Sequence, residues 1–141
     1  MTRDEITNFF VEWDGAWSVR DPDRLAAVYA PHAAVVSPMF KHLHGRAEIA
    51  ESYYRLFESF PDWTVTNEAP LIDGDRVARA FEATATHAGE FMGLKPTQRR
   101  CQIQGVRLFR LGADGIQEER RLYDFTNLLI QIGVLRSKPG Y

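Results

Sequence analysis

The chain has 141 residues, of which 45% are hydrophobic and 26% are charged, and its formal net charge is −2. This length and composition fit one globular domain with an ordinary hydrophobic core, and they exclude a disordered or fibrous protein. The weak negative charge argues against nucleic acid and membranes as partners, and the single cysteine, Cys101, excludes an intramolecular disulfide. We therefore predict one cytoplasmic domain over residues 1–141, with 137–141 as a frayed tail.

Helical signals dominate the first half of the chain. Thr2 and Glu5 have the spacing of a capping box, and the apolar residues after them recur at helical intervals. Asp21, followed by a proline, is a typical N-cap and should begin a second, short helix. A third helix is expected from Gly45 until Pro61 stops it.

Strand signals dominate the second half of the chain. A short strand is first predicted over 33–37, and an irregular loop over 39–44. The hydrophobic period then changes to two, and we expect strands over 63–67, 76–86, 100–111 and 116–123. The turn at 112–115 should join the last two strands as a hairpin, and a short helix should follow over 125–132.

Helices that precede consecutive strands with short turns predict an α+β fold. In this arrangement the N-terminal helices pack on one face of a strongly curved antiparallel sheet. A sheet bent in this way, with helices across its mouth, forms a cone that can enclose a small-molecule pocket.

Motifs along nearly the whole chain match one family. They lie at 45–49, 56–62, 74–77, 86–97, 105–110 and 123–133. In this order they resemble the SnoaL-like polyketide cyclases of the nuclear transport factor 2-like superfamily. The resemblance implies the cone-shaped fold, a homodimer formed through the outer sheet face, and a cyclase that needs no cofactor. It also implies that Asp124, near the end of the last strand, is the general acid and base of an intramolecular aldol closure.

Strand parity predicts which side chains face the pocket. In 100–111 the odd-numbered residues are the more apolar set, so Arg107 and Phe109 should point inward. The same test places Phe81 and His87 on the inner face of the preceding strand. We expect Trp17 and Tyr53, from the helices, to complete the substrate-binding lining.

The register of the last hairpin decides the charge of the pocket. With a four-residue loop at 112–115, Arg107 lies opposite Arg120, and Leu122 also faces inward. Two arginines opposite each other need an anion beside them, which Glu118, Asp124 or a substrate carboxylate can supply. These cations favour an anionic or aromatic ligand. A register shifted by one residue, or arginines at a solvated rim, is the alternative.

Several of these residues have a plain structural interpretation. Asp124 immediately precedes a helical segment, where aspartate is a preferred N-cap. His87 is either a second acid or base, or an oxyanion donor, or a solvated loop residue. The remaining histidines lie on predicted loops without a ligand spacing, so no metal site is expected at His32, His42 or His44.

Our leading hypothesis is a cofactor-independent cyclase or isomerase. Asp124 would remove a proton beside a carbonyl, and Arg107, Arg120 or His87 would stabilise the enolate oxygen. One alternative is an epoxide-hydrolase-like enzyme that uses Glu118 and Asp124 as its acids. The other is a non-catalytic ligand-binding or interaction module, which is favoured if Asp124 only caps the last helix. The predicted outer sheet face carries Val106, Leu108 and Tyr123, a composition suited to a homodimer contact.

Overall fold

The computed structural model describes residues 1–136, and the tail predicted at 137–141 lies outside them. Helices pack against one curved sheet, which confirms the predicted α+β class. The helices are α1 (Arg3–Ser18), α2 (Pro22–Ala27), α3 (Gly45–Ser59) and α4 (Phe125–Gln131). The strands are β1 (Tyr29–Ser37), β2 (Lys41–His44), β3 (Thr64–Asn67), β4 (Leu71–Asp73), β5 (Arg76–Thr86), β6 (Arg100–Gly112) and β7 (Gly115–Tyr123).

The first two helices begin where their capping residues predict. The hydroxyl of Thr2 accepts a hydrogen bond from the backbone N–H of Glu5, and the Glu5 carboxylate accepts one from the Thr2 N–H. Asp21 caps α2 by accepting from the N–H groups of Asp23 and Arg24. Local capping chemistry is therefore sufficient to locate both helix starts.

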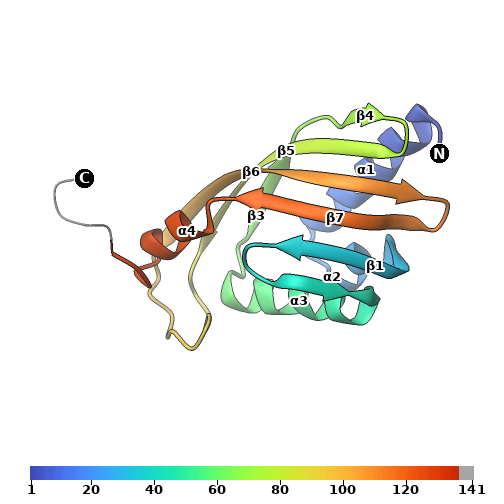
Figure 1. The fold of residues 1–141 in the computed structure, drawn as a ribbon. Coiled ribbons are helices and arrows are strands. Elements are labelled where there is room, and N and C mark those ends of the chain that lie inside the picture. Colours follow the sequence, from blue (N-terminus) through green and yellow to red (C-terminus); the bar gives the residue numbers. More distant parts are fainter. Residues whose placement is uncertain (137–141) are drawn as a thin grey trace.

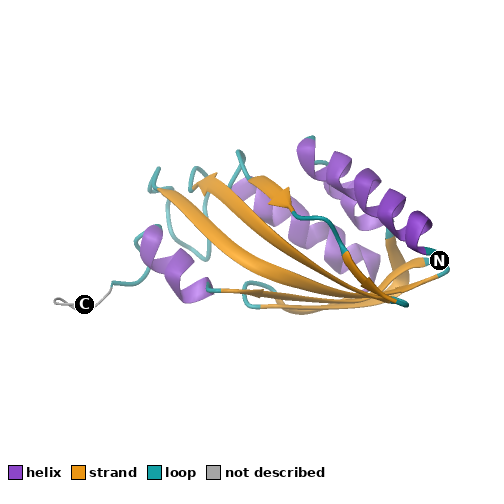
Figure 2. Ribbon diagram, turned by 90° about the horizontal axis from the view of Figure 1, so that it is seen from above, coloured by secondary structure: helices purple, strands orange, loops and turns teal. Residues whose placement is uncertain are grey.

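The sheet has the strand order β2-β1-β7-β6-β5-β3, with β4 paired to β5 (Figure 1). Helices α1, α2 and α3 lie on its concave side, while α4 lies at one end of the sheet (Figure 2). The core fills the space between the three helices and the inner face, where the largest fully buried side chains include Trp13, Tyr29, Tyr53 and Phe60. Over residues 1–136, none of the helices is both long and apolar enough to span a membrane.

The edge of the sheet differs from the prediction in three ways. Strand β1 is longer than the predicted 33–37, and the expected loop at 39–44 contains β2, which pairs with β1. Strands β1 and β7 run parallel, so the sheet is mixed. Gly115 permits this pairing, because its φ is +113° and a Cβ there would lie 2.1 Å from the Val28 carbonyl oxygen. The N–H of Ile116 donates to that same oxygen at 3.0 Å.

A β-bulge interrupts the hairpin of β6 and β7. Leu111 pairs with Ile116 as predicted, but Arg110 pairs with Glu118. Gln117 is therefore an extra residue in β7, and every later residue of that strand is shifted by one position relative to β6. A shift of one residue exchanges the two faces of a strand.

The bulge overturns part of the predicted pocket. Arg107 lies opposite Arg121, so the prediction that Arg120 faces Arg107 across the pocket was wrong. Arg120 and Leu122 lie on the outer face, where both are exposed. Tyr123, which we had placed on the outer face, turns inward. The inner face of β7 is formed by Glu119, Arg121 and Tyr123.

Parity in the two preceding strands is confirmed. Phe81 in β5 and Arg107 and Phe109 in β6 are all buried, and β5 and β6 pair in one uninterrupted antiparallel register. Where no bulge intervenes, the alternation of apolar residues assigns the faces correctly.

Candidate functional site

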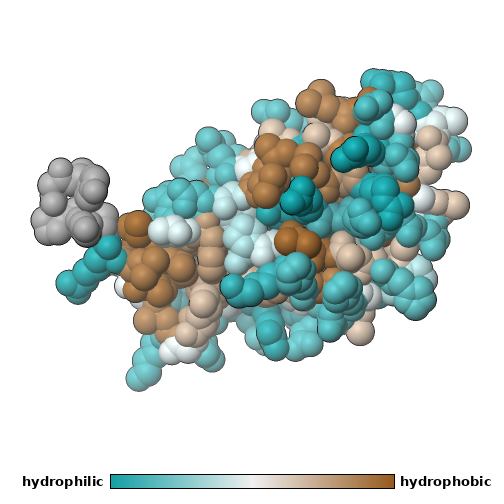
Figure 3. Space-filling model, viewed as in Figure 1, coloured by the Kyte–Doolittle hydropathy of each residue, from teal (hydrophilic) through white to brown (hydrophobic). Residues whose placement is uncertain are grey.

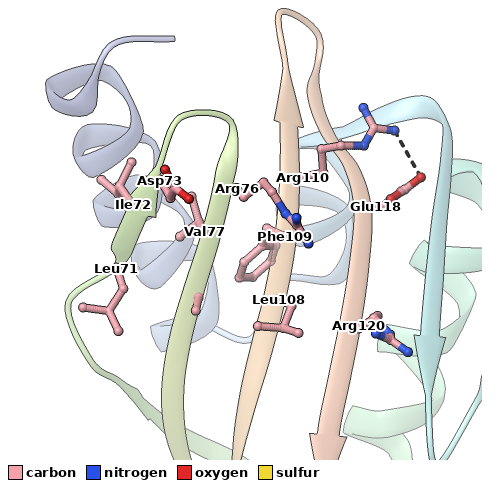
Figure 4. Close-up of a pocket in the computed structure, with 11 residues that line it drawn as sticks. Leu71, Ile72, Asp73, Arg76, Val77, Leu108, Phe109, Arg110, Glu118 and Arg120 are labelled. Carbon is pink, nitrogen blue, oxygen red and sulfur yellow. Dashed lines mark hydrogen bonds and ion pairs between the residues drawn. The ribbon is translucent and has the colours of Figure 1, made fainter.

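A broad hollow lies on the outer face of the sheet, with a volume of about 570 Å³ (Figure 4). It lies beside β4 and crosses β5, β6 and β7, with Leu71 and Leu108 among its apolar walls. Its ion pair between Arg110 and Glu118, 3.1 Å apart, is solvent-exposed. Water screens exposed charges, so they interact only weakly with a reacting group. We therefore do not take this groove as the candidate reaction site.

A second, interior cavity lies between the concave face and the helices. Its volume is about 20 Å³, roughly the room that one water needs. Two cations, Arg107 and Arg121, contribute to its wall, and no acidic residue does. The other lining residues are aromatic or apolar: Trp17, Met39, Phe40, Tyr53, Leu56, Trp63, Phe81, Ile103 and Tyr123.

The buried carboxylate of Glu119 contacts both arginines. Arg121 donates from Nε to Glu119 Oε2 at 3.1 Å and from Nη2 to Oε1 at 3.2 Å. Arg107 Nε lies 3.4 Å from the same Oε2. All three side chains are at most 8% exposed. Because two guanidinium groups share a single carboxylate, the wall of the cavity carries one surplus positive charge.

The cluster fixes the ionisation of its members. Burial raises the pKa of Glu119, but Arg121 and Arg107 outweigh burial and hold that pKa below its ordinary value. Burial lowers the pKa of Arg121, but Glu119 outweighs this and raises it well above its ordinary value. Glu119 is therefore a charged anchor and a poor proton acceptor at neutral pH.

A chain of hydroxyl groups connects the cavity to the carboxylate. Tyr29 donates to Glu119 Oε1, and the Tyr29 and Tyr53 oxygens are 2.7 Å apart. Because the single hydroxyl hydrogen of Tyr29 is donated to Glu119, the hydroxyl of Tyr53 must be the donor to Tyr29. Arg121 Nη2 donates to the Tyr53 oxygen at 3.2 Å. Burial raises the pKa of Tyr53, although Arg121 opposes this, so Tyr53 stays protonated.

Aromatic rings hold the Arg107 guanidinium in place. Its central carbon lies 4.3 Å from the Phe81 ring centroid and 4.9 Å from that of Trp17. Its Nη1 also donates to Asn67 Oδ1 at 3.2 Å. Such contacts stabilise a cation without neutralising its charge, so they leave the surplus charge available.

Three residues of the cavity wall carry buried N–H groups without a hydrogen-bond partner. Within residues 1–136, the buried indole N–H groups of Trp17 and Trp63 have no acceptor, and neither does Arg107 Nε. All three residues line the cavity. These three N–H groups are available to acceptor oxygens of a ligand. The Trp13 indole N–H and His87 Nε2, which lie outside the cavity, are also unpaired within residues 1–136.

Some of the residues predicted to bind substrate lie together around the interior cavity. Arg107, Phe81, Trp17 and Tyr53 all line the interior cavity. Phe109 is buried deeper, where its ring packs against Phe10 and Trp13 with centroids 5.0 and 5.5 Å apart. It belongs to the core beneath the cavity, while the outward-facing Arg120 and Leu122 are separated from the cavity by the sheet.

Asp124 and His87 do not line the interior cavity. Asp124 is exposed and accepts a hydrogen bond from the Asn127 N–H at 2.8 Å, as the N-cap of α4. His87 is fully buried between Phe60 and Phe91, and its Nδ1 accepts from the Thr97 N–H at 3.2 Å. Both residues therefore make structural contacts, and the solvated-loop interpretation of His87 was wrong.

Sequence parity missed three charged or polar residues of this site: Glu119, Arg121 and Tyr29. Glu118, which parity had placed inward, is exposed and pairs with Arg110 outside. The two carboxylates that epoxide hydrolysis requires, Glu118 and Asp124, therefore do not flank the interior cavity. In the described part of the chain, no group of three or more His, Cys, Asp or Glu side chains is placed to hold a metal ion.

The family profile of the SnoaL-like polyketide cyclases matches residues 10–132, so the chain belongs to that family. AclR from Streptomyces galilaeus, a candidate hydroxylase, is 25% identical over 99% of this chain and 87% of its own, with a TM-score of 0.83. IdmH from Streptomyces antibioticus, a candidate polyketide cyclase, is 25% identical over 89% of this chain and 96% of its own, with a TM-score of 0.74.

A third structure, from Catenulispora acidiphila, has a ketosteroid isomerase-like fold and was solved with trimethylamine. It is 19% identical over 89% of this chain and 92% of its own, with a TM-score of 0.75, and shows the shared fold alone. No functionally curated protein matches the chain.

We predict that acid destabilises the protein through His87. Burial lowers the pKa of His87 below its ordinary value of 6.5, so the unfolded chain binds this proton more readily. The stabilising contribution is complete above about pH 6.5 and is lost as the pH falls through the folded pKa. Urea denaturation between pH 7.5 and 5.5 should show a steeper loss for the native chain than for His87→Gln. Equal slopes would contradict this assignment.

We also predict that Asp124 can be replaced by asparagine without loss of stability. Asparagine caps helices as well as aspartate, whereas Asp124→Ala should cost about 1 kcal/mol of unfolding free energy. Chemical denaturation of both variants measures the difference. If asparagine destabilised the protein as much as alanine, the carboxylate charge would matter rather than the cap.

Proposed function

We propose that the protein is a small-molecule-binding cyclase or isomerase that holds a carbonyl compound in the cone by its enolate oxygen. The surplus positive charge at Arg107 and Arg121 carries this proposal. Loss of a proton beside a carbonyl moves negative charge onto the carbonyl oxygen, and buried cations stabilise that charge more than water does. The unused N–H groups of Trp17 and Trp63 would add hydrogen bonds to the same oxygen or to a neighbouring one.

The site favours substrates that are already acidic. Glu119 is held ionised by its two arginines and is a weak base, and no acidic residue lines the cavity. A 1,3-dicarbonyl compound forms its enolate readily, so it needs stabilisation of the oxygen more than a strong base. Because Tyr53 stays protonated and donates to Tyr29, solvent water would take the proton on enolisation and return it when the enolate is quenched. This chemistry agrees with the polyketide cyclase family to which the chain belongs.

A non-catalytic ligand-binding module is the second candidate. It is favoured by the position of Asp124, which caps α4 and is exposed to solvent. The acid/base role of Asp124 rests on the family resemblance. Once a substrate is known, Asp124→Asn distinguishes the possibilities, because a lost general base typically lowers turnover by about 10²-fold or more.

The anion preference can be tested with 2-naphthoate and its neutral relative 2-naphthalenemethanol. We expect 2-naphthoate to bind more tightly, and Arg107→Gln to weaken its binding roughly tenfold or more, the scale of one charged hydrogen bond. The variant should fold, because Glu119 keeps both hydrogen bonds to Arg121. Calorimetric titration measures the affinities.

Two further variants make this test selective. Arg120→Gln removes the same charge from the outer face and should leave naphthoate binding unchanged. Glu119→Gln removes the competing carboxylate and should strengthen naphthoate binding in whatever fraction of the protein folds. Equal affinity for the neutral alcohol, or unchanged binding by Arg107→Gln, would refute the oxyanion site.

We further propose a homodimer formed through the outer sheet face. Leu71 and Leu122 are 74% and 51% exposed there, next to the partly buried Val106 and Leu108. Figure 3 shows hydrophobic side chains over β5, β6 and β7, interspersed with charged ones, a composition typical of protein interfaces.

Sedimentation at micromolar concentration should therefore show two chains. Leu122→Glu should dissociate them, because a charge would be buried at the contact. Val11→Glu changes an exposed apolar residue of α1 and is the matched control. A monomer at high concentration, or dissociation by the control alone, would count against this interface.

A further inference from the structure

A surface cleft adjoins the interior cavity and shares part of its wall. The cleft has a volume of about 370 Å³ and lies between the turn after β1, the end of α3 and the loop at 90–93. Met39, Phe40 and Leu56 line both the cleft and the interior cavity. These three side chains are therefore the partition between the surface and the arginines.

The interior alone is too small for an organic ligand. Pockets that bind drug-sized molecules have volumes of roughly 300–1,000 Å³, whereas the interior cavity has about 20 Å³. The cleft has that capacity, and its walls include the apolar side chains of Phe91 and Met92. A ligand that reaches Arg107 must therefore displace the partition and leave most of its volume in the cleft.

The cleft and the interior cavity differ in charge, and this difference favours one orientation of the ligand. The cleft is lined by Glu58, Glu90 and a single cation, Arg55, which already pairs with Glu51 at 2.9 Å. The interior wall carries the two arginines. An acidic group is therefore repelled by the cleft and attracted by the interior, while an apolar body suits the cleft.

Two of the three partition residues, Met39 and Phe40, belong to a weakly held part of the sheet, whereas Leu56 lies in α3. Met39 and Phe40 lie in the turn between β1 and β2, and β2 is an edge strand paired only with β1. Lys41, which ends the turn, has a φ of +62°, a strained value for a residue other than glycine. The Phe40 N–H is held by one side-chain bond, to Ser37 Oγ at 2.8 Å. Few bonds must break for this turn to move.

We propose that the cleft binds the aromatic body of an acidic ligand, and that the turn at 38–40 moves aside so that the acidic end reaches Arg107 and Arg121. This inference rests on the proposed anion site and adds to it the route of entry and the shape of the ligand. The ligand class is an elongated aromatic compound with one acidic oxygen group at its end.

The test uses three carboxylates of increasing length: benzoate, 2-naphthoate and biphenyl-4-carboxylate. Their binding is followed by the fluorescence of Trp17 and Trp63, which line the interior. Affinity should rise with length. Met92→Glu adds a charge to the cleft and should weaken biphenyl-4-carboxylate roughly fivefold or more, and benzoate, which has the smallest apolar body, the least.

Stopped-flow mixing tests the moving turn. Phe40→Ala should raise the association rate of all three acids roughly fivefold or more, because opening would no longer displace a large side chain. Phe40→Leu is a milder version if the alanine variant does not fold. His42→Ala, on the same hairpin but lining neither space, should leave the rates unchanged.

The outcomes separate the two proposals. If the acids bind and depend on Arg107, but neither Met92→Glu nor the Phe40 variants have an effect, the cleft and the turn are excluded while the anion site stands. If none of the acids binds, the anion site fails and the inference fails with it.

Discussion

The buried group formed by Arg107, Glu119 and Arg121 is the constraint on which the rest of the interior depends. Removing each ion from water costs several kcal/mol, about the scale of the stability of the whole domain, and only close pairing offsets the cost. One carboxylate cannot neutralise two guanidinium groups. The aromatic rings around Arg107 and the hydroxyl chain from Tyr53 through Tyr29 reduce the remaining cost without removing the charge. The cluster thus links β1, β6, β7 and α3 and leaves the cavity electropositive.

This arrangement separates binding from proton transfer. The polar residues that line the cavity donate hydrogen bonds or carry positive charge, while the carboxylate nearest to them is engaged by its two arginines. A site of this kind stabilises negative charge that the ligand brings or develops. It depends on the acidity of the ligand itself, which explains why a substrate that enolises easily suits it better than a weak carbon acid.

Most of the fold could be predicted from the sequence, because its signals are local. Capping residues located the helix starts, and alternation assigned the faces of β5 and β6. The register of β7 could not be predicted in this way. Its sequence from Glu118 to Tyr123 has two acids, two arginines and then two apolar residues, so each face receives one of each under either register. Only the bulge at Gln117 selects the face with Arg121.

The roles of Asp124 and His87 were open for a related reason. A capping aspartate and a reactive one have the same sequence signal, and the side-chain environment alone distinguishes them. In both cases the side chain points to a local backbone partner, Asn127 for Asp124 and Thr97 for His87. The reactive interior is instead assembled from residues far apart in the chain, which a local pattern does not register.

The parallel pairing of β1 with β7 has a consequence for how the molecule is made. Tyr29 lies in β1 and Glu119 in β7, so their contact closes a long loop of the polypeptide between these two strands. Contacts of such long range are slow to form and cannot form on a partly synthesised chain. On the ribosome, the aromatic faces of α1, α2, α3 and the β1–β2 hairpin stay uncovered until the hairpin of β6 and β7 emerges and packs against them. The electropositive interior is thus completed only after β7 has emerged, and the nascent chain before that point is the state most prone to aggregation.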